Sequence, residues 1–329
     1  MTPARRTGLR VASGVAMSAL LLAGCGGQPA AHDAPGVRAT PATTPATPRV
    51  TPTAAPVPAR TRRPGPARIT KLLVVMVENH SLDEMRRQMP YTFGLGRRYG
   101  YATGYRAITH PSLPNYLAIS AGDTFGISDD KDPSAHPVRT GSVFGEALAA
   151  GRTATVYAED MPGTCATTNS GGYAVRHNPW TYHVAERTAC GRHDVPLTRL
   201  SADVRAGRLP NAGMVVPNVC NDAHDCPAAQ ADRWIRRVVG GLLGGPDFRS
   251  GRLLVVVTAD EDDHGQGNLV LTTLVSPQLR GVVVRRALDH YSLSRLYSEV
   301  LGVPPLRRAR TASSIARSFR LSVGPAPAG

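Results

Sequence analysis

Short apolar runs separated by mixed segments divide the chain from residue 69 onward. The run at residues 72–77 (LLVVMV) stops at Glu78, Asn79 and His80, and a second run at residues 253–257 (LLVVV) leads into four consecutive acids at 260–263. An uninterrupted apolar run of this length is typical of a strand buried on both faces of a parallel sheet. Because mixed, helix-like segments alternate with such runs, the pattern predicts an α/β fold. Three further strands are expected at residues 153–158, 214–219 and 269–275.

Apolar residues at helical spacing predict three helices. Residues 109–122 (THPSLPNYLAISAG) open with two prolines and Ser112, which predicts a turn that leads into a helix N-terminus. We expect Ser112 to lie where free backbone N–H groups and the helix dipole favour an anion. Two more helices are predicted, one around Trp234 and one that begins near Asp289 and closes the fold by Val300.

The polar residues after the two main apolar runs belong to one expected site. In open α/β sheets, ligands bind beyond the carboxyl ends of the strands. Two buried strands that each end in acidic residues can place carboxylates around one divalent cation. The alternative is that the four acids at 260–263 form a solvated acidic turn, as charge runs often do.

The N-terminal part reads as an export signal followed by a tether. Arg5, Arg6 and Arg10 precede a short apolar segment that ends in LLAGC at Cys25, which resembles the lipobox of bacterial lipoproteins. An ordinary secretory peptide or a weak membrane helix is the alternative. We therefore expect a signal peptide at residues 1–24, an acylated Cys25, and a disordered Pro/Thr/Ala-rich tether at 25–68.

The net charge of +14 is concentrated at the two ends of the chain. Residues 1–68 hold nine arginines and one aspartate, and the segment from Pro305 holds five arginines and no acid, so residues 69–304 are close to neutral. Nucleic acid needs a basic face on the folded domain, and it is excluded as the main partner. Basic ends suit anionic lipid or wall polymer. The expected tail at 305–329 is basic and poorly ordered.

Four cysteines remain once Cys25 is set aside, and in an exported protein an even set indicates disulfides. Three pairings are open. The close pair Cys220 and Cys226 is expected to bridge a loop, which leaves Cys165 with Cys190. A zinc site is the competing interpretation, but the tightest spacing is Cys-x5-Cys rather than Cys-x2-Cys.

Six motifs in a fixed order resemble the bacterial phosphoesterase family, which includes acid phosphatases and phospholipase-C-like enzymes of the alkaline phosphatase superfamily. The resemblance covers residues 71–302. It implies a three-layer α/β sandwich with a mostly parallel central sheet, and a metal-dependent phosphoric ester hydrolase. The motifs are ENHS at 78–81, HPSLPNY at 110–116, RHNPW at 176–180, VPNVCNDAHDC at 216–226, TADEDD at 258–263 and DHYSLSRL at 289–296.

The resemblance also implies roles for individual residues. Ser112 stands at the position of the nucleophile, so a phosphoserine intermediate is expected; the alternative is a helix cap. Because the expected metal ligands offer only oxygen atoms, Mg, Ca or Mn suits them better than Zn. These ligands are Glu78, Asn79, Asp260 and Glu261.

Histidines and asparagines of the same motifs complete the expected site. His177, His224 and His290 are expected to line the pocket and to donate to phosphoryl oxygens or protonate the leaving oxygen. A second metal site at Asp222, together with His224, is the further expectation from two-metal relatives. Substrate binding is expected of His110, Asn115 and Asn178, although histidines and asparagines in loops are often plain surface or turn residues.

The leading hypothesis is a lipid-anchored acid phosphatase that acts on phosphomonoesters. The alternative is a phosphodiesterase or phospholipase C that acts on lipid head groups or wall polymers, although the chain is shorter than the large phospholipase-C-type members. A non-catalytic surface protein is disfavoured by the intact Ser112 and acid set, and a sulfatase by the SLPNY context. The expected location is the outer side of the cell membrane, with part of the population secreted. The expected partners are a phosphorylated small molecule or lipid head group, and the membrane itself.

Overall fold

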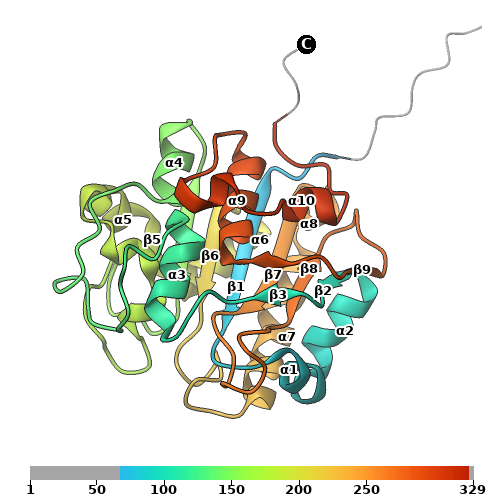
Figure 1. Cartoon of the computed structure of the whole chain (residues 1–329). Coiled ribbons are helices and arrows are strands. Elements are labelled where there is room, and N and C mark those ends of the chain that lie inside the picture. The colour runs from blue at the N-terminus through green and yellow to red at the C-terminus, as the bar shows by residue number, and fades with distance from the viewer. Residues whose placement is uncertain (1–66, 326–329) are drawn as a thin grey trace, which may run out of the picture. The chain divides into compact units, whose positions relative to one another are not determined.

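An eight-stranded, mostly parallel sheet forms the centre of the fold (Figure 1). The computed structural model describes residues 67–325. The predictions for the signal peptide, Cys25 and nearly all of the tether lie outside these residues. The strand order is β5-β4-β6-β1-β7-β8-β2-β9, and only β8 runs antiparallel to its neighbours. The α/β expectation with a mostly parallel sheet is confirmed.

The predicted strands are all present, with shifted ends, and several short ones are added. The strands of the main sheet are β1 (Lys71–Val77), β2 (Gly100–Ala102), β4 (Ala154–Ala158), β5 (Asp194–Pro196), β6 (Ala212–Val216), β7 (Leu253–Ala259), β8 (Thr272–Val275) and β9 (Val282–Val284). A separate two-stranded sheet consists of β3 (Tyr105–Arg106) and β10 (Leu288–Asp289).

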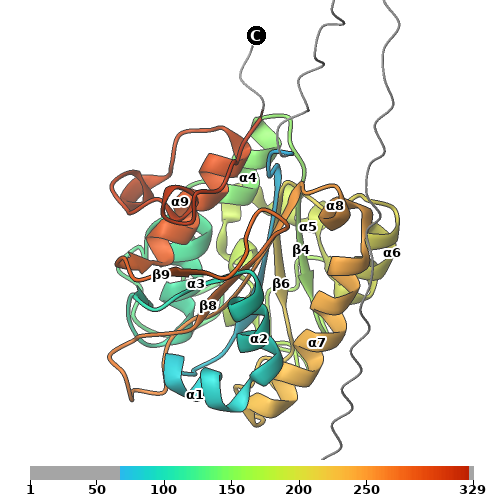
Figure 2. The same ribbon diagram turned by 90° about the vertical axis from the view of Figure 1, so that its right-hand side faces the viewer.

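Helices cover both faces of the sheet and make the three layers (Figure 2). One layer contains α3 (Ser112–Ala121), α4 (Val143–Ala149), α9 (His290–Leu301) and α10 (Ile315–Ser318). The opposite layer contains α1 (Leu82–Gln88), α2 (Pro90–Arg98), α6 (Leu200–Arg205), α7 (Ala228–Gly244) and α8 (Pro246–Arg249). Helix α5 (Arg187–His193) packs beside β5, and 3₁₀ turns lie at Val175–His177, Pro179–Tyr182, Val184–Glu186, Leu197–Arg199 and Arg307–Arg310.

The two strongest apolar runs are adjacent in the middle of the sheet. β1 and β7 pair in parallel over their full lengths, and Val77 stands opposite Ala259. Six of the seven residues of β1 and all of β7 are buried, because helices lie on both sides. In parallel strands that end level with each other, the next residues also lie side by side. This register brings Glu78 and Asp260 together at one edge of the sheet.

Both expected disulfides are present. Cys165 pairs with Cys190, and Cys220 pairs with Cys226. The zinc alternative for these four cysteines is therefore wrong. The Cys220–Cys226 bridge closes the loop that follows β6, at the same edge of the sheet as Glu78 and Asp260.

The segment after Pro305 differs from its prediction. It was expected to be poorly ordered because it is rich in arginine, but Ile315 and Phe319 are buried in the main core. Val323 also forms a bridge with Ile69 at the beginning of the domain. Four of the five arginines are exposed, whereas Arg307 is partly buried and donates to the carbonyls of Ala121 and Gly141. These contacts and a few well-spaced apolar residues make residues 305–325 part of the folded unit. None of the helices in the described part of the chain has the length and hydropathy that a membrane span requires.

Candidate active site

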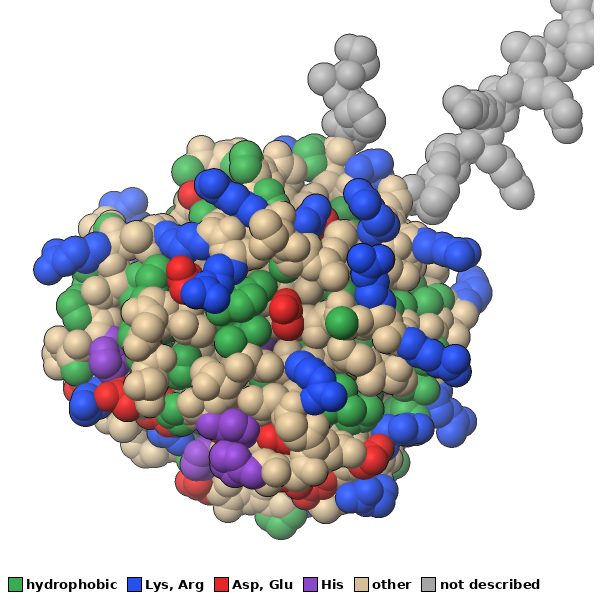
Figure 3. Space-filling model, in the orientation of Figure 1, with side chains coloured by type: hydrophobic (Ala, Val, Ile, Leu, Met, Phe, Trp, Pro, Cys, Tyr) green, Lys and Arg blue, Asp and Glu red, His purple; other side chains and the backbone are tan. Residues whose placement is uncertain are grey.

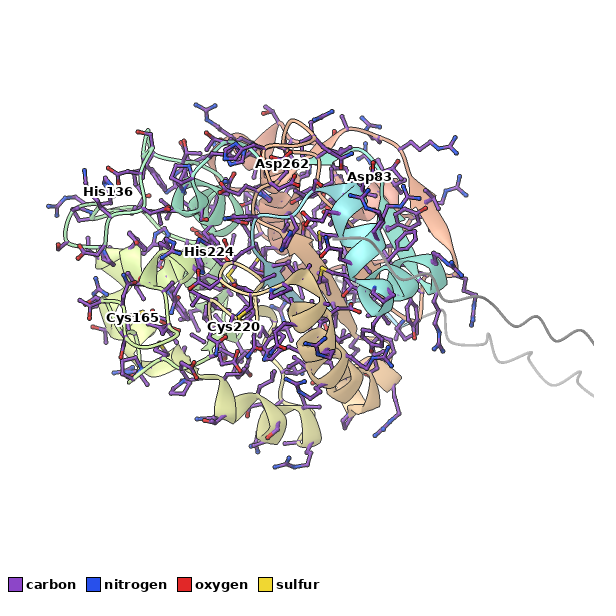
Figure 4. All side chains as sticks on the ribbon, turned by 90° about the horizontal axis from the view of Figure 1, so that it is seen from below. Asp83, His136, Cys165, Cys220, His224 and Asp262 are labelled. Atoms are coloured by element: carbon purple, nitrogen blue, oxygen red, sulfur yellow. A yellow bond between two sulfur atoms is a disulfide. The ribbon has the colours of Figure 1, made fainter. Side chains whose placement is uncertain are left out.

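Polar loops gather at the carboxyl ends of the central strands. Figure 4 looks onto this edge, where the loops that carry His224 and Asp262 both lie, and Figure 3 shows histidine and acidic side chains together at the lower end of the molecule. Each loop enters from a different strand or helix. The site is thus assembled from segments far apart in sequence, as expected for an open α/β sheet.

Glu78 and Asp260 occupy the two expected strand-end positions and are fully buried. The backbone N–H of Asp260 donates to the carbonyl of Val77 at 3.1 Å, which continues the ladder beyond the strands. The backbone N–H of Asn79 donates to the Asp260 carboxylate at 3.2 Å, and Asn79 has a positive φ of 51°. The chain turns sharply after β1 so that Glu78 points inward.

Ser112 is the first residue of α3 and lies directly against Glu78. Its hydroxyl donates to Oε2 of Glu78 at 3.1 Å, and only 2% of the residue is exposed. One helical turn later, the Tyr116 hydroxyl donates to Oε1 of the same carboxylate. The helix can begin at Ser112 because Pro111 is extended and cannot continue a helix backward. The structure therefore joins the expected nucleophile to the expected metal ligand.

His177 and Asp222 complete a buried group around Glu78. The Nε2 atom of His177 lies 3.4 Å from Glu78 Oε2, and its Nδ1 atom lies 3.2 Å from Asp222 Oδ2. The His177 ring also stacks on Tyr116, with ring centroids 5.4 Å apart. The second-metal expectation paired Asp222 with His224, but the structure places His177 beside Asp222 instead.

The donor atoms of this group fit a divalent cation. Glu78, His177 and Asp222 each offer one ligand atom, and these atoms lie within 4.8 Å of one another. Several buried polar atoms lack a hydrogen-bond partner in the described structure, and burying such atoms unpaired is unfavourable. A cation would satisfy the oxygens among them and one of the two ring nitrogens of His177, because a single ion cannot reach both nitrogens of one imidazole. The unpaired atoms are Asn79 Oδ1, Asp260 Oδ2, Asp222 Oδ2 and both ring nitrogens of His177.

The oxygen set at Glu78, Asn79 and Asp260 suits a hard cation such as Mg or Mn. His177 adds a nitrogen donor that the expected ligand set did not include, and a nitrogen donor also suits Zn. The expected preference against zinc is therefore weakened by the geometry.

The pKa values of the buried group are also consistent with a bound cation. Burial, reinforced by the facing Asp260 and Asp222, raises the pKa of Glu78 well above that of an ordinary glutamate. Burial likewise raises the pKa of Asp260, and raises the pKa of Asp222 to about 7. Burial lowers the pKa of His177 to about 3. A cation among these groups reverses the carboxylate shifts, because opposite charge favours the ionised form.

Glu261 lies beside this group, in contact with two of the expected substrate-binding residues. Its Oε2 atom lies 3.2 Å from Nδ1 of His110 and accepts from Asn115 Nδ2 at 3.3 Å. Burial and the neighbouring Asp260 raise the pKa of Glu261 to about 9. His110 also stacks on His264, with centroids 3.9 Å apart, and 27% of its side chain is exposed. His110 therefore forms part of the accessible rim of the site.

Asn115 also orders the turn before the helix. Its Oδ1 accepts from the N–H groups of Ile108 and Thr109, while its Nδ2 donates to the carbonyls of Thr109 and Pro111. These contacts fix the backbone that presents Ser112. Asp262, one of the four acids that the alternative interpretation places in a solvated turn, is buried, and it accepts from the backbone N–H groups of His264 and Gln266. Asp263 is exposed, as expected.

His290 lies behind Asp260 rather than at the rim. Its Nε2 contacts the backbone carbonyl of Asp260 at 2.5 Å, and its Nδ1 contacts the Tyr105 hydroxyl at 2.9 Å. The residue is fully buried, and burial lowers its pKa to about 4. In this arrangement His290 supports the position of Asp260, since both of its nitrogens are engaged.

His224 and Asn178 lie on either side of the group. His224 is at the rim with 29% of its side chain exposed, and it contacts Asp225 through Nδ1 at 2.6 Å and Arg176 through Nε2 at 3.1 Å. Asn178 is fully buried and donates from Nδ2 to the carboxylate of Asp194, next to the disulfide that includes Cys190. The amide of Asn178 is thus committed to Asp194 and not to the Ser112 group.

Sequence reasoning missed three neighbours of the site. Tyr116 was noted only as a helical residue, although its spacing of one turn from Ser112 places both hydroxyls on one face. Asp130 and Arg176 lie close to the N-terminus of α3, since the Leu113 N–H donates to Asp130 at 2.9 Å and Arg176 lies 3.8 Å from Asp130. Arg176 belongs to the RHNPW motif, which was a usable signal; Asp130 had none.

Comparison with known proteins gives the site its context. The family model described as "Phosphoesterase family" matches residues 85–304. A phosphatidylinositol-3-phosphatase of Mycobacterium tuberculosis is 30% identical over 250 residues, which cover 74% of this chain and 81% of that protein. The chain belongs to the Phosphoesterase family.

Other relatives match this chain over a smaller share of their own length. A phosphate-repressible acid phosphatase of Penicillium chrysogenum is 29% identical over 63% of this chain and 53% of its own length, so the chain spans about half of that relative. The shared family and these homologues make the protein a phosphoric ester hydrolase.

Solved structures support the fold. A protein of the alkaline phosphatase superfamily from Vibrio parahaemolyticus superposes with a TM-score of 0.52 at 10% identity, over 72% of this chain and 67% of that one. The lipoteichoic acid synthase LtaP of Listeria monocytogenes gives the same TM-score at 10% identity, over 76% of each chain. At such low identity these similarities establish the architecture alone, and they agree with the alkaline-phosphatase-like sandwich.

Proposed function

We propose that the protein is a metal-dependent phosphomonoesterase that works through a phosphoserine intermediate on Ser112. The observation that carries the proposal is the contact of the Ser112 hydroxyl with Glu78 inside a group of buried, incompletely paired carboxylates and His177. The acid phosphatases among the relatives support a monoester substrate.

The chain's own residues account for most of the reaction. Ser112 Oγ attacks phosphorus, its proton passes to Glu78 Oε2, and the bond from phosphorus to the leaving oxygen breaks. His224, at the accessible rim, is the candidate donor of a proton to that oxygen once its Nε2 exchanges Arg176 for the substrate, because its Nδ1 is held by Asp225. Water then attacks phosphorus and gives a proton to His224, while Glu78 returns its proton to the Ser112 oxygen as the phosphoserine bond breaks; phosphate is released and all three groups are restored.

Glu78, Asn79, Asp260, His177 and Asp222 are the residues that would hold the cation, with Glu261 as a further expected ligand. When bound, a divalent cation supplies positive charge to the phosphoryl oxygens and lowers the pKa of the nearby hydroxyl. The buried carboxylates fix the position of that charge relative to Ser112.

The substrate class follows from the named relatives. The mycobacterial relative is a phosphatidylinositol-3-phosphatase, so a phosphorylated lipid head group joins phosphorylated small molecules as a proposed substrate. We also propose that Cys25 anchors the protein at the outer side of the cell membrane, which rests on the lipobox-like LLAGC sequence.

The test compares p-nitrophenyl phosphate, its bis-ester and phosphatidylinositol 3-phosphate as substrates. We expect turnover of the monoesters that is lost on chelation, returns on addition of Mg or Mn, and falls by at least about a thousandfold in Ser112→Ala, because the nucleophile is gone. Ser120→Ala, in the same helix and equally buried, is the matched control and keeps its activity. Faster turnover of the bis-ester than of the monoester would favour the phosphodiesterase alternative.

A further inference from the structure

The site presents a phosphate group with an excess of negative charge. Glu78, Asp222, Asp260 and Glu261 all lie around Ser112, and Asp262 contacts the rim residue His110 at 3.3 Å. A phosphomonoester carries two negative charges near neutral pH. One divalent cation offsets only part of this repulsion, so a second fixed cation is expected close to the nucleophile.

Arg176 is the guanidinium in this position. The next residue, His177, contacts both Glu78 and Asp222, so Arg176 lies beside the carboxylate group. It directly precedes His177 in the chain, and its Nη2 donates to His224 Nε2 at 3.1 Å. Only 19% of the Arg176 side chain is exposed, so it is held at the entrance rather than spread over the surface.

Asp130 links Arg176 to the start of the catalytic helix. One carboxylate oxygen of Asp130 accepts from the Leu113 N–H at 2.9 Å, and the other lies 3.8 Å from Nε of Arg176. Leu113 is the neighbour of Ser112, and the next residue, Pro114, has no N–H. Asp130 thus lies between Arg176 and the residue next to the nucleophile. At 3.8 Å the ion pair is loose, which leaves guanidinium N–H groups available to another anion.

We propose that Arg176 binds the phosphoryl oxygens of the substrate, and that Asp130 is the residue that positions it. This inference rests on the proposed function and deepens it, because it names the group that selects phosphomonoesters. A monoester offers three charged or partly charged oxygens, whereas a diester offers two and carries one charge less. Loss of Arg176 therefore affects monoesters more than diesters.

The competing explanation is a purely structural ion pair between the RHNPW segment and the loop that carries Asp130. If that explanation holds, loss of the pair lowers the stability of the protein without changing its preference between monoester and diester. A pair elsewhere, between the exposed Arg199 and the buried Asp203 at 3.5 Å, provides the control for that explanation.

The experiment uses the full-length protein with its metal restored. Binding of inorganic phosphate is measured by calorimetry, and kcat/KM is measured for p-nitrophenyl phosphate and its bis-ester, in wild type, Arg176→Ala, Arg176→Lys, Asp130→Asn and the control Arg199→Lys. Melting temperatures show whether each variant is folded. Turnover of the Arg176→Ala variant is repeated with added guanidinium at millimolar concentration, which is too dilute to unfold a protein.

We expect Arg176→Ala to weaken phosphate binding and lower kcat/KM for the monoester by about 10- to 100-fold, as loss of a charge-assisted contact predicts. The bis-ester is expected to lose less than about threefold, a smaller loss because it carries one charge less. We expect Arg176→Lys to keep part of the activity, and added guanidinium to rescue part of the activity of Arg176→Ala. A purely structural ion pair would not give this rescue. Asp130→Asn raises KM more than it lowers kcat, while the control Arg199→Lys behaves like wild type.

Equal phosphate affinity in wild type and Arg176→Ala would overturn the inference, as would a wild-type protein that binds no phosphate. An equal loss for monoester and diester would overturn the selectivity. These outcomes are separate from failure of the proposed function, which is judged by the turnover of the wild type alone.

Discussion

Glu78 uses its two carboxylate oxygens on two hydroxyl groups of one helix, Ser112 and Tyr116, which lie one turn apart. This arrangement depends on three separate facts about single residues. Glu78 directly follows a strand, Ser112 begins a helix, and Tyr116 returns to the same face of that helix. Each side chain is buried, so none can be replaced without leaving another polar group unpaired.

Asp194 allows a prediction about stability at the same scale. It is fully buried, and burial raises its pKa to about 8. The folded state therefore retains a proton that the unfolded state releases above about pH 4, so the free energy of unfolding falls as the pH rises from about 4 to 8. Asp194→Asn removes this dependence, because an amide does not titrate, and its remaining oxygen can still accept from Asn178 Nδ2.

We expect Asp194→Asn to melt higher than wild type at pH 8, with a difference that shrinks toward pH 4. Thermal melts at several pH values measure this difference directly. The exposed variant Asp160→Asn is the control and should follow wild type at every pH. A difference that is constant across the range, or that grows toward acid, contradicts the assignment.

At the scale of elements, the two disulfides are expected to have different roles, one mainly in stability and the other in the active site. Cys165–Cys190 closes 25 residues beside α5, whereas Cys220–Cys226 closes six residues in the loop that carries Asp222. In the chain-entropy account the longer loop contributes about 3 kcal/mol and the shorter about 2 kcal/mol. The backbone carbonyl of Asp222 also accepts from the Glu78 N–H at 2.9 Å, so the shorter loop is tied to the site.

Replacing each pair by serine should separate the two effects. We expect the Cys165/Cys190 variant to lose more stability and keep most of its kcat/KM. The Cys220/Cys226 variant should lose about tenfold in kcat/KM and in metal affinity, because the position of Asp222 is relaxed. Denaturant unfolding and metal titration check the two claims, and the opposite pattern would contradict the account.

The same scale shows what the sequence could predict. The strands β1 and β7 were found because both faces of each are buried, and their carboxyl ends identified Glu78 and Asp260. The helix at Ser112 followed from its prolines. Arg176 and Asp130 escaped because their meeting depends on how two irregular loops pack, and no local period records that. The segment after Pro305 was misjudged because composition outweighed a few buried residues such as Ile315 and Phe319.

For the molecule as a whole, the prediction concerns its location. We expect the wild-type protein, expressed in a bacterial host, to sediment with membranes and to be released by detergent but not by salt. Cys25→Ala should move it to the soluble or secreted fraction, because the acyl anchor is lost. A Cys25→Ala protein that stays with membranes to the same extent, and is released by salt, would show that the basic segments alone hold it there.

The account of the whole molecule depends on Ser112 as the group that takes the phosphoryl from substrate. The most direct measurement is mass spectrometry of protein quenched in acid during turnover of p-nitrophenyl phosphate with metal present. The account predicts one added phosphoryl group on the peptide that contains Ser112, absent after chelation and absent in Ser112→Ala. Phosphate found on another residue would contradict the account. So would an unmodified Ser112 peptide during turnover, because the ester would then be hydrolysed by direct attack of water without a covalent intermediate.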